Sequence, residues 1–355
     1  MPLMLDEIKE QPDAVARTLD GEQASVAALA EALRTQSPRL IVIAARGTSD
    51  NAATFGRYLF ECSLGIPVSL AAPSVFTLYR ADLRLRGALV IGISQSGEAE
   101  DVTEVIRRAD EQGATTCAIT NQSGSPLASA AQHVLLSHAG HERSIAATKT
   151  YTTQLALLLL LAAAVAGDRE RRESLKALPE ATAQALAVEK PIAQAAGGYA
   201  DINECVMLAR GYNYATAQET ALKMTETCYM AAEAFSTADF QHGPIAMVES
   251  GTPAVIYVAP GAAHADTLSM ARRLRELGAN TVVVSHDREA LSTAALPLPV
   301  EIVVEEALTP VPYWRVTCRG PRGMTPMPRG GFARWSRRAS CGLPEADRAL
   351  KGAEV

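Results

Sequence analysis

The sequence predicts an α/β protein with two tandem, doubly wound parallel-sheet domains and flanking helices. The first observation is an internal repeat: residues 40–49, LIVIAARGTS, recur as residues 204–213, ECVMLARGYN, and both copies lead an apolar run into an Arg-Gly turn. The second is that apolar runs of five or six residues alternate with helix-length segments, which is typical of parallel strands covered on both faces. The third is that the repeat continues, because residues 88–93 parallel residues 254–259.

Each element follows in chain order. Residues 1–37 predict one or two leading helices, and residues 38–167 predict the first sheet domain. A polar helical connection over residues 168–198 ends at Gly197-Gly198, and residues 199–313 predict the second sheet domain. In both halves a strand leads to a helix that ends at a glycine, Gly113 or Gly278, before the next strand. Ligands of such sheets bind beyond the carboxyl ends of the strands, where the strand order reverses.

Composition excludes several classes of function. The formal net charge of -6 argues against nucleic-acid binding, which needs clustered Lys and Arg. The longest apolar run, residues 155–166, is shorter than the roughly 18 residues of a membrane span and predicts a buried helix. The six cysteines show no CxxC spacing, so we expect buried free thiols and no zinc site. The first residues show no basic segment followed by an apolar one, so we expect no secretory signal and a cytoplasmic protein.

The loop Ser94-Gln95-Ser96-Gly97 follows a predicted buried strand and precedes a helix. Hydroxyl, amide and free backbone N–H groups then meet at a helix N-terminus, which predicts an anion site. A plain helix cap is the alternative interpretation, because Ser is common in front of an acidic first turn. Thr48 and Ser49 end another predicted strand and add hydroxyl groups to the same anion.

Further along, Glu219, Lys223 and Glu226 have i, i+4, i+7 spacing and share one face of a predicted helix. A carboxylate whose pKa is tuned by a nearby lysine can act as a base that takes up and returns a proton. The alternative is an ordinary Glu–Lys pair on an exposed helix. For His242, the alternative is a loop histidine that bonds its own turn before Gly243-Pro244.

Four motifs together resemble the SIS (sugar isomerase) family, and more narrowly the isomerase half of glucosamine-6-phosphate synthase and the stand-alone glucosamine-6-phosphate deaminases. Their order and spacing hold from about residue 40 to residue 313. The motifs are RGTS at residues 46–49, SQSGE at 94–98, ATKTYTTQ at 147–154, and ETALKMTE at 219–226 with AEAF at 232–235 and QHGP at 241–244. The resemblance implies flavodoxin-like sheets. Independently of it, we expect Asp50 and Asn51 to cap the helix that follows them.

The resemblance also assigns roles by position. Glu226 matches the carboxylate that moves a proton between C1 and C2, Lys223 supports it, and His242 matches the histidine that assists ring opening. In the family the loop of that histidine reaches the neighbouring subunit, so a homodimer is implied. Lys149 matches a structural turn and is kept out of the catalytic set. The residues that match substrate-binding positions are Thr48, Ser49, Ser94, Gln95, Ser96, Ala147 and Glu219.

The sequence departs from the family at two places. Ala99 stands where the family supplies another hydroxyl group for the phosphate. Residues 314–355 are rich in Arg, Gly and Pro and lack the family's closing helix and lysine, so we predict a disordered segment or the product of a frameshift shortly after Tyr313. Resequencing the gene through this region tests the frameshift.

The function that follows is isomerising deamination of an amino-sugar phosphate, glucosamine 6-phosphate to fructose 6-phosphate and ammonia, without metal or organic cofactor. Deamination is favoured over amination because fewer than 40 residues precede the region of resemblance, which begins at about residue 40, and we expect no glutaminase domain in them. The alternatives are a ketose–aldose isomerase, a deglycase of amine-linked sugar phosphates, an aminotransferase-related protein and a non-catalytic sugar-phosphate sensor. We expect no nucleic-acid or membrane partner.

Overall fold

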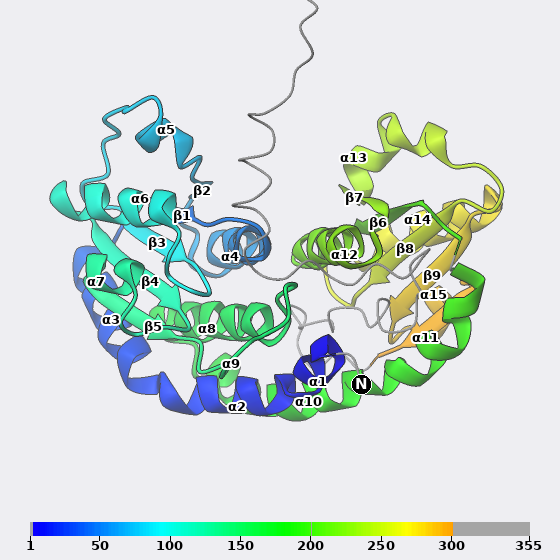
Figure 1. Cartoon of the computed structure of the whole chain (residues 1–355), viewed down its shortest axis with the longest axis horizontal. Coiled ribbons are helices and arrows are strands. Elements are labelled where there is room, and N and C mark those ends of the chain that lie inside the picture. The colour runs from blue at the N-terminus through cyan, green and yellow to red at the C-terminus, as the bar shows by residue number, and fades with distance from the viewer. Residues whose placement is uncertain (1–2, 200, 301–355) are drawn as a thin grey trace, which may run out of the picture. The chain divides into compact units, whose positions relative to one another are not determined.

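The computed structural model describes residues 3–199 and 201–300 of the chain. Two five-stranded sheets lie among helices in this part of the chain, and each sheet is parallel throughout (Figure 1). This confirms the predicted fold class. The predicted tail, residues 314–355, lies outside the described residues.

The first sheet has the strand order β2-β1-β3-β4-β5, which places the reversal of order between β1 and β3. Val42 of β1 pairs with Val90 of β3 in parallel register. The polar loops after these two strands therefore start side by side at one edge. The strands are β1 (Ile41–Ala44), β2 (Val68–Leu70), β3 (Leu89–Ile93), β4 (Thr115–Thr120) and β5 (His133–Leu136).

The second sheet repeats this topology, since its order β10-β9-β8-β6-β7 is the same arrangement read from the other end. Here the order reverses between β6 and β8, and Val206 pairs with Ala254. The sequence motif at residues 231–236 also proves to be a strand, which the repeat had not indicated. The strands are β6 (Glu204–Ala209), β7 (Ala231–Ser236), β8 (Pro253–Val258), β9 (Asn280–Ser285) and β10 (Leu296–Pro299).

Helices after the strands complete both domains. The helices α6 and α14 end just before Gly113 and Gly278, which both have φ +78, as expected for a left-handed helix end that favours glycine. The helices of the first domain are α4 (Thr48–Leu64), α5 (Ser74–Thr77), α6 (Glu100–Glu111), α7 (Pro126–Ala130) and α8 (Lys149–Ala166). Those of the second are α12 (Asn213–Cys228), α13 (Thr237–Gln241), η4 (Pro244–Met247), α14 (His264–Glu276) and α15 (Arg288–Leu291).

The flanking segments are helical, but more broken than the sequence suggested. Three leading helices are present instead of one or two. Pro179 and Pro191 lie in the first turns of separate short helices in the connection, where a proline needs no N–H partner. The leading helices are α1 (Leu3–Lys9), α2 (Gln11–Gly21) and α3 (Gln23–Gln36). The connection contains α9 (Arg169–Ser174), η1 (Leu175–Ala177), α10 (Leu178–Ala185), η2 (Leu186–Val188), α11 (Glu189–Ala195) and η3 (Ala196–Tyr199).

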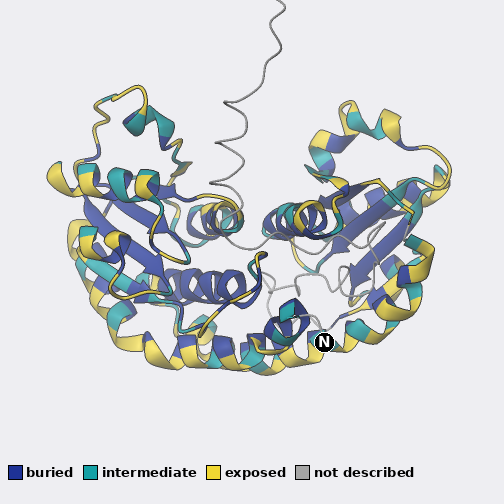
Figure 2. Ribbon diagram, viewed as in Figure 1, coloured by how far each residue is buried: buried dark blue, intermediate teal, exposed yellow. Residues whose placement is uncertain are grey.

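Both sheets are buried on their two faces, and the outer sides of the helices carry the exposed residues (Figure 2). The helix α8 is apolar and long enough to cross a membrane by length and composition alone, yet 89% of it is buried in the protein. It packs against α2, α3 and α4. The predicted buried helix is therefore a core helix, and its N-terminal end carries polar side chains to the site described next.

Candidate functional site

The loop after β3 forms a cup of hydroxyl and backbone N–H groups. The N–H of Gly97 donates to the hydroxyl of Ser94 at 3.1 Å, and the N–H of Glu98 donates to Ser96 at 3.3 Å. Gly97 has φ +68, and a Cβ atom there would lie 2.0 Å from the Ser125 hydroxyl. Only glycine fits this position, so the loop is held in its tight form.

The turn after β1 lies beside that cup. Gly47 has φ +56, and α4 begins at Thr48. The amide Nε2 of Gln154, on α8, donates to the Ser49 hydroxyl at 3.1 Å. Since the Ser49 oxygen accepts from Gln154, its own hydrogen is free to be donated to a ligand. The Oε1 atom of Gln154 is buried without a hydrogen-bond partner among the described residues.

These two loops and α8 enclose a cavity of about 240 Å³ that also reaches Glu226 on α12. It therefore brings together most of the predicted substrate-binding residues and the predicted proton-transfer carboxylate. Arg46, Thr150 and Gln154 also line it; they lie inside the sequence motifs, but the sequence indicated no role for them. The lining residues are Arg46, Thr48, Ser49, Ile93, Ser94, Gln95, Ser96, Ala99, Ile145, Ala147, Thr150, Gln154 and Glu226.

On α12, the three residues predicted to share one helical face do so. The Nζ atom of Lys223 lies 3.1 Å from Glu219 Oε1 and 2.8 Å from Glu226 Oε2, and it donates to the Thr48 hydroxyl at 2.9 Å. Lys223 and Glu219 are 2% and 1% exposed, whereas Glu226 is 33% exposed. The surface-pair interpretation is thus wrong for Glu219 and Lys223, which are core residues, and Glu226 is the member of the cluster that a ligand can reach.

Glu219 links the two domains through hydrogen bonds. Its carboxylate accepts from Thr48 at 3.1 Å and from the Asn51 amide at 2.7 Å. Burial raises the pKa of Glu219, while the Lys223 ammonium and these hydrogen bonds oppose that rise. The expectation that Asn51 caps α4 is wrong, because α4 has no side-chain cap hydrogen bond and Asn51 reaches across to Glu219 instead.

Two further residues are placed away from the cavity. His242 follows α13 with an exposed side chain and is not among the residues that line the cavity. Lys149 is buried, forms an ion pair with Glu10 and donates to the carbonyl of His141 at 2.9 Å. Its amine is thus engaged in holding the loop that precedes α8.

That loop, residues 137–148, is fixed by two buried carboxylates. Glu7 of α1 accepts from the N–H of Arg143 at 2.5 Å and from the N–H and hydroxyl of Ser144. Glu142 accepts from the N–H and hydroxyl of Thr148, at 2.6 and 2.8 Å, and from the hydroxyl of Thr150. The loop carries Ile145 and Ala147 to the cavity, so the leading helix α1 shares in shaping the site.

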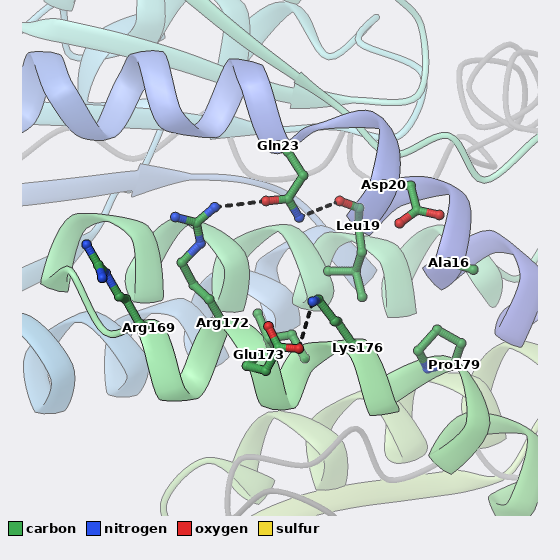
Figure 3. Close-up of a pocket in the computed structure, with 10 residues that line it drawn as sticks. Ala16, Leu19, Asp20, Gln23, Arg169, Arg172, Glu173, Lys176 and Pro179 are labelled. Carbon is green, nitrogen blue, oxygen red and sulfur yellow. Dashed lines mark hydrogen bonds and ion pairs between the residues drawn. The ribbon is translucent and has the colours of Figure 1, made fainter.

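A larger hollow of about 830 Å³ lies elsewhere, beside α2 and α9 (Figure 3). Its polar groups mostly satisfy one another: Arg172 donates to Gln23 at 3.0 Å, and Lys176 forms a 2.7 Å pair with Glu173. None of the motif residues that converge on the smaller cavity lines this hollow. The smaller cavity is therefore the candidate site.

Comparison with known proteins agrees with this architecture. The SIS domain family matches residues 12–164 and 199–302. A glutamine–fructose-6-phosphate aminotransferase (isomerizing) of Methanothermobacter thermautotrophicus is 36% identical over 312 residues, covering 87% of this chain and 52% of that protein. The chain thus spans about half the length of this relative.

Solved structures show the same arrangement. A proposed phosphosugar isomerase of Silicibacter pomeroyi is 36% identical with a TM-score of 0.79, over 90% of this chain and 95% of that one. The C-terminal domain of glucosamine-fructose-6-phosphate aminotransferase from Francisella tularensis is 28% identical with a TM-score of 0.78, over 87% and 91%. The motifs, the two sheets and these matches lead to one conclusion. The chain belongs to the SIS domain family and is homologous to the isomerase domain of glutamine–fructose-6-phosphate aminotransferase.

Proposed function

We propose that this protein catalyses isomerising deamination of an amino-sugar phosphate, converting glucosamine 6-phosphate and water to fructose 6-phosphate and ammonia. The observation that carries the proposal is that the Glu226 carboxylate lines the same 240 Å³ cavity as the Ser94-Gln95-Ser96 anion cup. Binding of the phosphate alone does not require the Glu226 carboxylate in the same cavity.

The chemistry uses the open-chain aldose. Glu226 removes the proton from C2, and that electron pair forms the C1–C2 double bond while the C1 carbonyl oxygen takes a proton from water, which gives an enolamine. Glu226 then returns its proton to C1, and the nitrogen lone pair forms the C2 iminium of fructose 6-phosphate. Water adds to the imine carbon, and ammonia leaves. Lys223, 2.8 Å from Glu226 Oε2, holds the carboxylate in place, and a single base that works on both carbons is what such a transfer needs.

We propose that the protein acts as a homodimer in which His242 of one copy completes the cavity of the other and assists ring opening. The support is that His242 is exposed, at the end of α13, and stands outside the cavity lining of its own chain. An exposed histidine that retains a place in the family motif is suited to act on a neighbouring copy.

The experiment is to supply glucosamine 6-phosphate to the purified chain and measure fructose 6-phosphate and ammonia, with Glu226→Gln as the test variant. Loss of the base is expected to lower kcat about 10²- to 10⁴-fold while fructose 6-phosphate still binds. The matched control is Glu204→Gln, an exposed glutamate at the start of β6, which should retain full turnover.

Other outcomes distinguish the alternatives. Full turnover by Glu226→Gln would remove the proposed base. Interconversion of fructose 6-phosphate with glucose 6-phosphate, and no ammonia release, would identify a ketose–aldose isomerase. Binding of sugar phosphates with no turnover of any of them by the wild-type chain would identify a sensor.

A further inference from the structure

Arg46 lines the cavity but has no assigned role. Among the described residues that line it, Arg46 is the one cationic side chain, and Glu226 is the one anionic side chain. The hydroxyl and amide groups of the cup can donate hydrogen bonds to a phosphate, but they carry no charge. A phosphate dianion therefore depends on Arg46 for its nearest opposite charge in this lining.

Asp101 holds the Arg46 guanidinium in place. The Nε and Nη2 atoms of Arg46 lie 2.7 and 2.6 Å from Asp101 Oδ2, in the first turn of α6. Arginine has five N–H donors in a rigid plane, so this contact leaves donors for a second acceptor. Arg46 is 57% exposed and Asp101 30%, so an incoming ligand can reach the guanidinium.

One wall of the cavity cannot donate a hydrogen bond to a phosphate through its side chain. Ala99 lines the cavity and offers only a methyl group. A phosphate has three oxygens to satisfy, and arginine can bind two of them with parallel N–H bonds. The Arg46 guanidinium, which lines the same cavity, can supply both the charge and the directed N–H bonds that Ala99 cannot.

The internal repeat provides a comparison inside the same chain. Arg210 follows β6 as Arg46 follows β1, precedes Gly211 with φ +64, and lies 3.2 Å from Asp266 in the first turn of α14. An Arg–Asp pair is therefore common to both domains.

The surroundings of the two pairs differ. Arg210 lines a cavity of about 130 Å³ whose other walls are mainly aromatic and apolar, where the first domain has hydroxyl groups. Tyr212 and Asn213 replace Thr48 and Ser49, and Ala259-Pro260 follow β8 where Ser94-Gln95 follow β3. The Arg–Asp ion pair is present in both domains, but only in the first domain does the arginine line a cavity that also contains the anion cup.

From this contrast we infer that Arg46, held by Asp101, is the charged group that binds the substrate phosphate and selects phosphorylated over unphosphorylated sugars. The inference rests on the proposed function, since it assigns a ligand group within the same cavity. Arg210 has no such role. The two arginines give a matched pair of variants, because each loses one Arg–Asp contact on a partly exposed surface.

The experiment compares Arg46→Ala, Arg46→Lys and Arg210→Ala by calorimetric titration with fructose 6-phosphate and with fructose, and by steady-state kinetics. Arg46→Ala is expected to weaken fructose 6-phosphate binding about tenfold or more and to raise KM, with kcat little changed. Its fructose affinity should stay at the wild-type value. Arg46→Lys should recover part of the loss, and Arg210→Ala should stay within about twofold of wild type.

The result that would overturn the inference is an equal effect of Arg46→Ala and Arg210→Ala on fructose 6-phosphate binding, since both would then report only a structural ion pair. A second overturning result is an equal loss of fructose and fructose 6-phosphate affinity. Failure of the wild-type chain to bind any sugar phosphate would instead reject the proposed function. Thermal unfolding of each variant confirms that it is folded.

Discussion

The ammonium group of Lys223 lies 2.8 Å from Glu226 Oε2 and at the same time contacts the fully buried carboxylate of Glu219. The Lys223 ammonium thus contacts one carboxylate that a ligand can reach, that of Glu226, and one that a ligand cannot reach, that of Glu219. Removing the ammonium leaves Glu219 buried without its counter-charge. The cluster is therefore expected to be sensitive to loss of its central member.

We predict that Lys223→Met lowers the free energy of unfolding by about 3–5 kcal/mol, because breaking a buried ion pair leaves an uncompensated charge. Urea unfolding at pH 7 measures this change. Lys176→Met is the matched control: its 2.7 Å pair with Glu173 is fully on the surface, and its loss should cost at most about 1 kcal/mol. Equal costs for the two variants would mean that Glu219 is already neutral in the folded protein.

The fold and much of the cavity could be predicted from the sequence because they depend on local patterns. Apolar runs give buried strands, the repeat gives the second domain, and polar residues at strand ends give the cup. Ser94 and Thr48 could be grouped because strand order in such sheets brings the loops after neighbouring strands together. The family roles of these residues stay predictions.

What the sequence did not indicate depends on distant contacts. Glu7 lies more than a hundred residues from Ser144, and its carboxylate looks like any other helix glutamate in the sequence. Asn51 was misassigned because its position in the first turn suits a cap, whereas the tertiary contact with Glu219 competes for the same amide. Such pairings are fixed by packing, which no local pattern records.

The position of Glu7 gives a second prediction. Its carboxylate accepts from the backbone of Arg143 and Ser144, and Glu7→Gln places an amide donor where those donors need an acceptor. The loop that carries Ile145 and Ala147 should loosen, and KM for the sugar phosphate should rise about tenfold. Asp6→Asn, a half-buried neighbour on α1, is the control. If KM is unchanged in both variants, α1 has no part in shaping the site.

A pH dependence follows from Glu219. Burial raises its pKa above the usual value of 4.5, so between 4.5 and the raised pKa the folded protein binds more protons than the unfolded chain. The free energy of unfolding from this group therefore falls as the pH rises through that window. Glu219→Gln should flatten the slope.

Urea denaturation of wild type and of Glu219→Gln at several pH values above 4.5 gives the slope of the unfolding free energy against pH for each protein. Subtracting the two slopes removes the contribution of the other titrating groups, which both proteins share. Glu173→Gln, which changes an exposed carboxylate, should leave the slope as it is. A wild-type protein that gained stability over Glu219→Gln as the pH rose would show that the Lys223 contact outweighs burial.

The proposed sharing of His242 between copies predicts complementation. His242→Asn and Glu226→Gln should each lower turnover about 10²-fold or more when expressed alone. In a mixed dimer, the copy with Glu226 intact receives His242 from its partner, so co-expression in equal amounts should restore about a quarter of wild-type turnover. Activity of the mixture no higher than that of its parts would contradict a shared site, and sedimentation of the wild type checks the dimer.

The thiols provide the last prediction. Burial raises the pKa of Cys117 and of Cys205 to about 12, whereas Cys62 is exposed. Thiolate is the reactive form, and at pH 8 a thiol with pKa 12 is ionised to only about 1 part in 10⁴. In a background where the partly buried Cys228 and the two cysteines beyond the described residues are replaced by serine, iodoacetamide should label Cys62 rapidly and the two strand cysteines only after unfolding. Cys62→Ser should abolish the fast phase, as mass spectrometry of the digested protein can show. Rapid labelling of Cys117 in the folded protein would mean instead that the first sheet opens locally, because only exposure to solvent could lower the pKa of that thiol.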